Sequence, residues 1–303
     1  MKGPRTVWLI DVKRTMEIAM PVQELRAVEP RTLTPSSDNM VGSSRKIVET
    51  VVISLPGASD RRANMTAMLK DSKLDWTFFD AHASLLHKGL IYDPRDVKRA
   101  FGRSLSSAQI AVGSSHVAVL SAFLERNAAD YVLVLEDDII LDGAFPVDAF
   151  TTFCKEKEID YIRLFGKHYA RAVQLGFFFD RSIVRFKTTP TGMQAYLMSR
   201  RGARLFVESF RSVDQPIDLI MDSFWKTGLP LYSIFPYPVI ERYSPTSIPI
   251  PAARRELNAA EQIARLTRRM ATKARKSWAN LLLRKNDKQM RRRLGPFQQI
   301  FDK

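Results

Sequence analysis

The sequence lacks the residues that several common kinds of site require. Its 303 residues include one cysteine, Cys154, so an internal disulfide and a multi-cysteine zinc site are both excluded. No two of its four histidines are spaced four residues apart, which excludes the helical zinc-protease motif. There is also no P-loop, no dinucleotide-binding glycine fingerprint and no G-x-S-x-G elbow. Cys154 has no nucleophile motif around it, and we interpret it as a structural thiol.

Long apolar runs are missing as well. No segment approaches the ~20 apolar residues that a helix needs to span a bilayer. Near the N-terminus, the apolar run 7–10 is followed at once by Asp11 and then by Lys13, which makes it too short for a signal peptide. We therefore expect the protein to stay in the compartment where it is made, and the single cysteine fits a reducing one.

The basic excess is concentrated at the C-terminal end of the chain. The formal net charge is +15. Residues 254–303 contain 15 lysine and arginine residues and 4 acidic ones, whereas the preceding residues contain 32 basic and 28 acidic ones. The globular part is therefore nearly neutral, and the tail makes the protein basic.

Three consecutive carboxylates follow the most strand-like segment of the chain. The run 131–135 is short, apolar and contains two valines, which favours a buried strand over a helix. Glu136, Asp137 and Asp138 come next. Three acids at the end of a buried strand are costly unless something neutralises them, and ligands of α/β sheets bind at the carboxyl ends of strands. The segment therefore indicates a divalent-cation site, with ordinary turn chemistry as the alternative.

The chain is predicted to have three parts: an N-terminal extension over 1–45, a domain over 46–250 and a basic helical tail over 251–303. Hydrophobic residues make up 45% of the sequence, enough for a sizeable core. Strand-like and helical segments alternate in the domain, which is typical of an α/β fold with a mixed central sheet. The predicted strands cover 47–55, 76–79, 131–135, 161–165, 172–179, 194–198 and 229–235.

Several helix-start signals lie between these strands. Ser59 or Asp60 is expected to cap one helix, and Ser106 with Gln109 forms a capping-box pattern for another. Residues 214–216 indicate a further helix with proline in its first turn. Other helices are expected over 15–27 and 201–210.

The tail has the pattern of a basic amphipathic helix that contains a tryptophan. Its apolar residues recur at helical spacing: Ile263, Leu266, Met270, Ala274, Trp278 and Leu281. Arginines and lysines occupy the other faces. Such a helix can lie on an anionic membrane surface, dock on its own domain with a solvated basic face, or bind nucleic acid.

Several separated segments together resemble glycosyltransferase family 25, which includes lipopolysaccharide galactosyltransferases and collagen galactosyltransferases. The family helix that reads like L-T-x-G-E-I-G-C-x-L-S-H matches 105–116 without a gap, and Leu105, Ile110, Ser115 and His116 agree. The other matching segments are 52–55 with 60–62, the aromatic strand 78–81, the L-E-D-D segment 135–138, the T-G-x-x-A-Y pattern 191–203 and the P-x-D segment 216–218. The likeness covers about residues 47–240.

The chain departs from the family pattern at three positions of that helix. Gln109 stands where the family has glutamate, and Ala108 and Ala111 stand where it has glycines. If the glutamate has a chemical role, this chain lacks it; the capping-box pattern leaves a structural role open for Gln109.

The resemblance implies a GT-A-like, single Rossmann-type domain and a metal-dependent, inverting sugar transfer. Glu136 and Asp138 are the expected ligands of Mn²⁺ or Mg²⁺, which would stabilise the leaving diphosphate. Inversion needs a base for the acceptor hydroxyl, and Asp218 of the P-x-D pattern is expected in that role, with Asp222 as second choice. Asp218 could instead merely complement a helix N-terminus.

Six other residues are expected near the donor. The predicted substrate-binding residues are Arg61, Arg62, Asp80, His116, Asp137 and Tyr196. Five of them have a plainer alternative: a solvated helix face for the arginines, a turn cap for Asp80, a buried hydrogen-bonded role for His116 and a core position for Tyr196.

The resemblance and the tail together predict a cytoplasmic enzyme on the inner face of the cytoplasmic membrane. It would move a sugar, with galactose expected, from a UDP-sugar to a lipid-linked oligosaccharide such as a lipopolysaccharide core. No nucleic acid is expected as a partner, because the basic residues lie in the tail and no DNA or RNA motif occurs. A nucleic-acid-binding protein and an inactive glycosyltransferase-like binding module are the alternatives.

Overall fold

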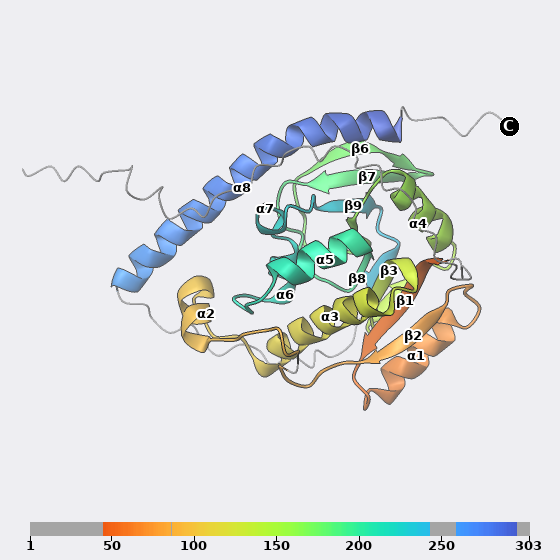
Figure 1. The fold of residues 1–303 in the computed structure, drawn as a ribbon, viewed down its shortest axis with the longest axis horizontal. Helices are drawn as coiled ribbons and strands as arrows, with labels where there is room; N and C mark the ends of the chain where they lie inside the picture. The colour runs from red at the N-terminus through yellow and green to blue at the C-terminus, as the bar shows by residue number, and fades with distance from the viewer. Residues whose placement is uncertain (1–44, 86, 243–258, 296–303) are drawn as a thin grey trace, which may run out of the picture. The chain divides into compact units, whose positions relative to one another are not determined.

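The computed structural model describes residues 45–85, 87–242 and 259–295 (Figure 1). The described residues belong to one compact unit, 44–303, which contains both the sheet and the C-terminal helix. The helix predicted over 15–27, most of the extension 1–45 and both ends of the tail 251–303 lie outside the described residues.

A mixed eight-stranded sheet forms the centre of the described fold, in the order β2-β1-β3-β8-β5-β9-β7-β6. β2, β1 and β3 are parallel, whereas β8 runs antiparallel to both of its neighbours. A small second sheet pairs β4 with β10. The strands are β1 Lys46–Ser54, β2 Trp76–Asp80, β3 Ala129–Glu136, β4 Ile139–Leu141, β5 Tyr161–Arg163, β6 Ala172–Phe178, β7 Arg181–Phe186, β8 Ala195–Ser199, β9 Tyr232–Phe235 and β10 Val239–Glu241. The expected α/β class with a mixed sheet is therefore confirmed.

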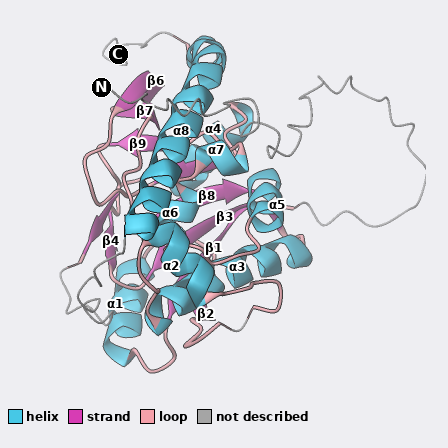
Figure 2. Cartoon of the chain, turned by 90° about the vertical axis from the view of Figure 1, so that its left-hand side faces the viewer, coloured by secondary structure: helices cyan, strands magenta, loops and turns pink. Residues whose placement is uncertain are grey.

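Helices cover both faces of the sheet, so the core has two parts (Figures 1 and 2). On one face, α3, α5, α6 and α7 bury a cluster that contains Val51, Val132 and Tyr196. On the other, α1 and α4 bury a cluster that contains Val52, Leu133 and Cys154. The helices are α1 Ser59–Leu69, α2 Pro94–Phe101, α3 Ser107–Arg126, α4 Val147–Glu156, α5 Arg200–Ser209, α6 Ile217–Met221, α7 Phe224–Thr227 and α8 Ala259–Leu294.

The alternation of side chains along β3 explains this two-sided core. Val132 and Val134 point to one cluster, and Leu133 and Leu135 point to the other. Because both faces are covered, the strand reads as a continuous apolar run, as central strands of α/β sheets do. It ends at Glu136, so the carboxylates begin where the covered part of the sheet stops.

Two helix starts test the capping predictions. At α3, the Ser106 side chain accepts from Gln109 N–H and the Gln109 side chain accepts from Ser106 N–H, so the capping box is confirmed. At α1, the prediction was wrong: the helix includes Ser59, and Ala58 at the N-cap offers no side-chain acceptor. Proline also falls one position earlier than expected at α6, where Pro216 is the N-cap.

Helix α3 is long and apolar enough to cross a membrane, which the sequence prediction overlooked. Half of that stretch is buried inside the protein. It includes Ser114, Ser115 and His116, which are buried and polar and would be costly in lipid. α3 is therefore a core helix of the domain.

Helix α8 packs its C-terminal half on the sheet through a buried ion pair. Both carboxylate oxygens of Asp287 accept from Arg185 of β7, at 2.6 and 2.8 Å. Asn280 Oδ1 accepts a further Arg185 hydrogen bond at 2.8 Å, and Met290 is buried against the sheet cluster. Because Arg185 is 1% exposed, the guanidinium depends on α8 for its compensating charge.

Removing that charge tests how firmly α8 is held. We expect Asp287→Ala to lower the free energy of unfolding in urea by about 3–5 kcal/mol, because a buried guanidinium loses its carboxylate. The matched control is Glu158→Ala. It removes the carboxylate that forms an exposed ion pair with Arg293, a residue of α8. That change should cost less than about 1 kcal/mol. Equal costs for the two variants would contradict the docking of α8 through Arg185.

Candidate active site

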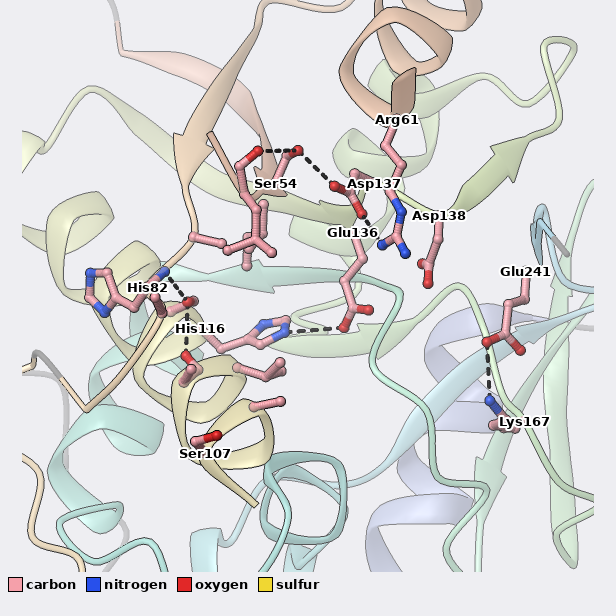
Figure 3. A pocket seen from close by; sticks show the side chains of 18 residues that line it. Ser54, Arg61, His82, Ser107, His116, Glu136, Asp137, Asp138, Lys167 and Glu241 are labelled. Carbon is pink, nitrogen blue, oxygen red and sulfur yellow. Dashed lines mark hydrogen bonds and ion pairs between the residues drawn. The ribbon is translucent and has the colours of Figure 1, made fainter. Parts of the chain in front are cut away.

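A cavity of about 390 Å³ opens where β1 and β3 end and α3 begins (Figure 3). The acidic triplet lines it together with Ser54, Arg61 and His116. Lys167 and Glu241 line it from the other side. The cavity therefore lies at the carboxyl ends of two parallel strands, where ligands of open α/β sheets bind.

Asp137 is held by two donors from other elements. Its Oδ2 accepts from the Ser54 hydroxyl at 2.7 Å, and its Oδ1 accepts from Arg61 at 3.1 Å. The residue is 8% exposed. With both oxygens occupied, Asp137 ties the end of β3 to the end of β1 and to α1. Asp137 lines the cavity, and its ion pair positions Arg61 beside the other two carboxylates.

Glu136 is oriented by a buried chain of hydrogen bonds. His116 Nε2 lies 3.3 Å from Glu136 Oε1, and His116 Nδ1 lies 3.1 Å from the Tyr196 hydroxyl. Burial raises the pKa of Tyr196 well above its usual value, so its hydroxyl keeps its proton and can donate to Nδ1. That assignment leaves the proton of His116 on Nε2, where it can be donated to Glu136. Tyr196 does not line the cavity and is fully buried, so the structure places it behind the site and not against a substrate.

Asp138 is the carboxylate that the protein leaves uncompensated. Its Oδ1 is buried and has no hydrogen-bond partner. Burial, together with the charges of Glu136 and Asp137, raises the pKa of Asp138 to about 7, and Arg61 offsets only part of this. Its main-chain oxygen accepts from Arg242 N–H at 2.7 Å, which fixes the turn that presents it. Asp138 therefore stabilises the fold poorly and offers a free oxygen to the cavity.

The opposite wall of the cavity comes from residues that the sequence analysis missed. Glu241, at the end of β10, accepts from Lys167 at 3.0 Å and from the Gln194 amide at 3.3 Å. Figure 3 shows the carboxylates of Glu136, Asp138 and Glu241 turned toward the same part of the cavity. Glu241 also raises the pKa of Asp138, as expected for a nearby like charge. A hundred residues separate it from the triplet, and only the pairing of β10 with β4 brings it there.

The carboxylates fit a divalent cation that a ligand helps to hold. Among the described residues, no three acidic, histidine or cysteine side chains form a group able to hold a metal ion. Asp138 Oδ1 and Glu136 nevertheless offer hard oxygen ligands in a buried acidic cavity. Magnesium-like ions are commonly bound by one or two carboxylates plus substrate phosphates. The donor set therefore fits a cation shared with a phosphate ligand.

Arg62 and Asp80 meet each other outside this cavity. Arg62 pairs with the Asp80 carboxylate and donates to the main-chain oxygens of Ser54 and Leu55 at 3.0 and 3.2 Å. Neither residue is among the described cavity-lining residues. The pair connects the ends of β1 and β2. The structure thus brings Arg61 to the site and keeps Arg62 behind it.

Asp222 is in the wrong place for the base that we expected as second choice. It is fully buried, pairs with Arg163 and accepts from Thr191 N–H at 3.0 Å. Burial raises its pKa in spite of Arg163. A carboxylate in this position cannot reach an acceptor hydroxyl. Its contacts make it a support for the turn that follows β7.

Asp218 supports the same turn from a less buried position. Its Oδ2 accepts from Gly192 N–H at 3.2 Å, and its Oδ1 accepts from Leu219 N–H at 2.8 Å. Thr191 and Gly192 both have positive φ, of 55° and 75°, which points their N–H groups toward the two aspartates. Asp218 is not among the described residues that line the cavity.

The replaced family positions on α3 have separate consequences. Gln109 is engaged with Ser106 in the capping box and accepts from Arg103 at 3.3 Å. It does not line the cavity, whereas Ala108 and Ala111 do. The glutamine therefore performs a structural task, and the two alanine methyl groups narrow the cavity.

Comparisons with known proteins find a matching family model and similar proteins. The model of the family described as "Glycosyltransferase family 25 (LPS biosynthesis protein)" matches residues 47–221. The chain is 26% identical over 208 residues to the lacto-N-neotetraose biosynthesis glycosyltransferase LgtE of Neisseria gonorrhoeae, covering 61% of this chain and 71% of the relative. The Neisseria meningitidis serogroup B protein of the same name is 27% identical over 199 residues, with the same coverage.

Two solved structures have weaker similarity to the chain. One is A197 from STIV, with a TM-score of 0.37 and 12% identity, covering 68% of this chain and all of that one. The other is a glycosyltransferase involved in glycosylation of the major capsid of PBCV-1, with a TM-score of 0.30 and 9% identity, covering 63% and 71%. At these TM-scores neither contributes to the argument.

The raised pKa of Asp138 predicts a pH-dependent cost to stability. In the unfolded chain the carboxyl loses its proton near pH 4, and in the folded protein it does so near pH 7, so stability falls as the pH rises between these values. Without divalent cations, we expect Asp138→Asn to be more stable than the parent by about 2 kcal/mol at pH 8 and equal to it near pH 4. Urea unfolding at both pH values measures this. Asp142→Asn, a control at a part-buried ion pair outside the cavity, should show no such gain. A pH-independent difference for Asp138→Asn would contradict the assignment.

Proposed function

The chain belongs to glycosyltransferase family 25, and from that premise we propose that it transfers a sugar from a UDP-sugar to a lipid-linked oligosaccharide. Galactose is the expected sugar, and a lipopolysaccharide core is the expected kind of acceptor. The observation that carries the proposal is the unpaired, buried Asp138 oxygen in a cavity shared with Glu136 and Arg61. The names of the Neisseria relatives, which place them in oligosaccharide biosynthesis, support the acceptor class.

Asp138 and Glu136 would hold Mn²⁺ or Mg²⁺ in this proposal. When bound with a nucleotide diphosphate, the cation supplies Lewis-acid stabilisation for the charge that the leaving UDP carries away. Asp138 gains a counter-charge for an oxygen that is otherwise buried without a partner. His116 holds Glu136 in place by its hydrogen bond.

Cationic side chains on both sides of the carboxylates can hold the phosphates. Arg61 lies on the Asp137 side and Lys167 on the Glu241 side, and both line the cavity. Their charges would attract the diphosphate and keep its leaving end near Asp138. Each is positioned by one carboxylate, so neither needs to reorganise when the donor binds.

Two carboxylates compete for the role of base in an inverting displacement. Asp218 is favoured by the family pattern, yet its oxygens accept main-chain hydrogen bonds away from the cavity. Glu241 lines the cavity and its side chain is 36% exposed, which leaves an oxygen accessible to an acceptor hydroxyl. We retain Asp218 as the proposed base and name Glu241 as the alternative that the geometry favours.

The binding-module alternative loses its main support in the structure. It rested on Gln109 and the two lost glycines, and Gln109 is a capping residue here. The triplet, its supporting residues and the cavity are all present. We propose an active enzyme that works at the inner face of the cytoplasmic membrane, where a lipid-linked acceptor would be assembled.

Loss of the uncompensated carboxylate tests the function directly. We expect Asp138→Ala to lower metal-dependent release of UDP from a UDP-sugar by about 10³-fold, because several kcal/mol of charge stabilisation is lost. The assay is a screen of UDP-sugars with Mn²⁺ or Mg²⁺ and an oligosaccharide acceptor. Asp142→Ala is the matched control, since that aspartate pairs with Arg181 outside the cavity. Activity that survives both chelation and Asp138→Ala would sink the proposal.

Replacing each base candidate separates their roles. Replacing the carboxylate of the true base by an amide should lower the kcat of the enzyme by about 10²–10⁴-fold, with little change in donor binding. Asp218→Asn and Glu241→Gln are each compared by kcat, KM and pH profile. If Asp218 is the base, its variant loses the acidic limb of the pH profile, because the base must be deprotonated to act. If Asp218 only supports the turn, kcat falls with an unchanged pH profile and reduced stability.

A further inference from the structure

The apolar stripe of α8 faces solvent instead of the protein. Its residues are Ile263, Leu266, Met270, Trp278, Leu281 and Leu282, and each is between 49% and 64% exposed. The spacing of the sequence pattern is therefore that of an amphipathic helix whose apolar side the domain does not cover. Six large apolar side chains in one stripe form a patch of the kind that soluble proteins rarely leave open.

The domain binds the opposite side of the same helix. The residues of α8 that contact the sheet and its core clusters include Asn280, Leu283, Asp287 and Met290. Leu281 and Leu283 are two residues apart and so point about 200° apart around the helix axis. Docking on the domain thus uses a narrow mixed face and leaves the apolar stripe exposed. Two of the alternatives for this helix, docking and surface binding, are therefore compatible.

Positive charge surrounds the stripe. Helix α8 contains twelve arginines and lysines and two acidic residues, and one of those acids, Asp287, is used by Arg185. Lys273, Arg284 and Lys288 lie on one flank of the stripe at helical spacing. Long cationic side chains at such positions can extend their charges to the polar layer of a membrane while apolar neighbours sit deeper.

The cations are denser still beneath the N-terminal half of α8. A hollow of about 480 Å³ lies between this half and the end of α2. Six of its described lining residues are cationic and none is acidic: Arg103, Arg265, Arg268, Arg269, Lys273 and Lys276. Burial lowers the pKa of Lys276; the charge of Asp222 opposes this shift, and that of Arg171 adds to it. The described lining of this hollow is thus strongly cationic.

We propose that α8 docks the protein on an anionic lipid bilayer, with the stripe from Ile263 to Leu282 among the acyl chains and the surrounding cations on the phosphate head groups. A lipid surface provides both an apolar phase and negative charge, and the helix presents a partner for each. A second copy of the chain would bring two strongly cationic helices together. A nucleic acid would leave the apolar stripe in water.

The buried Arg185–Asp287 pair gives this contact a mechanical consequence. α8 is held to β7 and β6 by hydrogen bonds. When α8 lies in the membrane surface, the sheet therefore has a fixed orientation relative to the membrane. The proposal rests on the surface of α8 alone and does not depend on sugar transfer. It remains testable with protein that has no measured activity.

Co-sedimentation of the full chain with vesicles tests the proposal. We expect binding to vesicles of phosphatidylcholine mixed with phosphatidylglycerol, weaker binding at high salt, and little binding to phosphatidylcholine alone. Met270→Glu/Trp278→Glu should lower the partition coefficient by about tenfold or more, because two apolar side chains no longer enter the bilayer. The matched control, Ile91→Glu/Tyr169→Glu, changes two exposed apolar residues of the domain by the same charge and should bind within about twofold of the parent.

Further measurements separate the other occupants. Trp278 emission should shift to the blue with anionic vesicles, and Trp278→Phe should bind while losing the shift. Circular dichroism and a urea unfolding curve confirm that the variants fold. Unchanged vesicle binding by the stripe variant would overturn the proposal. This is the result expected if another segment of the chain covers the stripe. A parent that is dimeric and becomes monomeric with the stripe variant, without binding vesicles, would also overturn it, as would salt-dependent RNA binding in place of vesicle binding.

Discussion

The charge that collects at the end of β3 is the constraint on which the site depends. An apolar strand delivers three carboxylates to one edge of the sheet, where burial makes each of them costly. The protein compensates two of them: Ser54 and Arg61 hold Asp137, and His116 holds Glu136. Asp138 receives no such help. A fold selected for stability alone would have paired or removed this residue; in the proposed function, a cation bound with the donor compensates it.

The local half of this arrangement could be predicted from the sequence, and the non-local half could not. The strand before Glu136, the capping box of α3 and the alternation of strands and helices depend on neighbours within a few residues, and the structure has them as expected. Glu241 and Lys167 carry no motif, because their place at the site comes from the pairing of β10 with β4 and from the chain after β5. The prediction of Asp222 as a second-choice base failed for the same reason. Its spacing from Asp218 indicates one helical face but does not reveal the buried Arg163 that pairs with it.

Helix α8 shows a different limit of sequence patterns. Its period correctly predicts which residues share a face, because that follows from helix geometry alone. It does not predict which face the domain covers, because that depends on Arg185, a single buried cation on β7 that requires a carboxylate. One ion pair with an asparagine and a few apolar contacts therefore decides the orientation of thirty-six residues. The apolar face remains free to serve a partner of another kind.

The P-x-D segment can affect the site without touching a substrate. Asp218 and Asp222 accept the two N–H groups of the turn at 191–192, and Arg163 donates to the Thr191 main-chain oxygen at 2.7 Å. Two residues beyond that turn, the main-chain oxygen of Gln194 accepts from Glu136 N–H at 2.8 Å. A change at Asp218 can therefore affect Glu136 through the main-chain groups of Gly192, Gln194 and Glu136. This effect does not require proton transfer to Asp218. The family pattern of a turn, a strand and a later aspartate is thus explained by support of the acidic edge, and a chemical role for Asp218 has to be shown over and above that support.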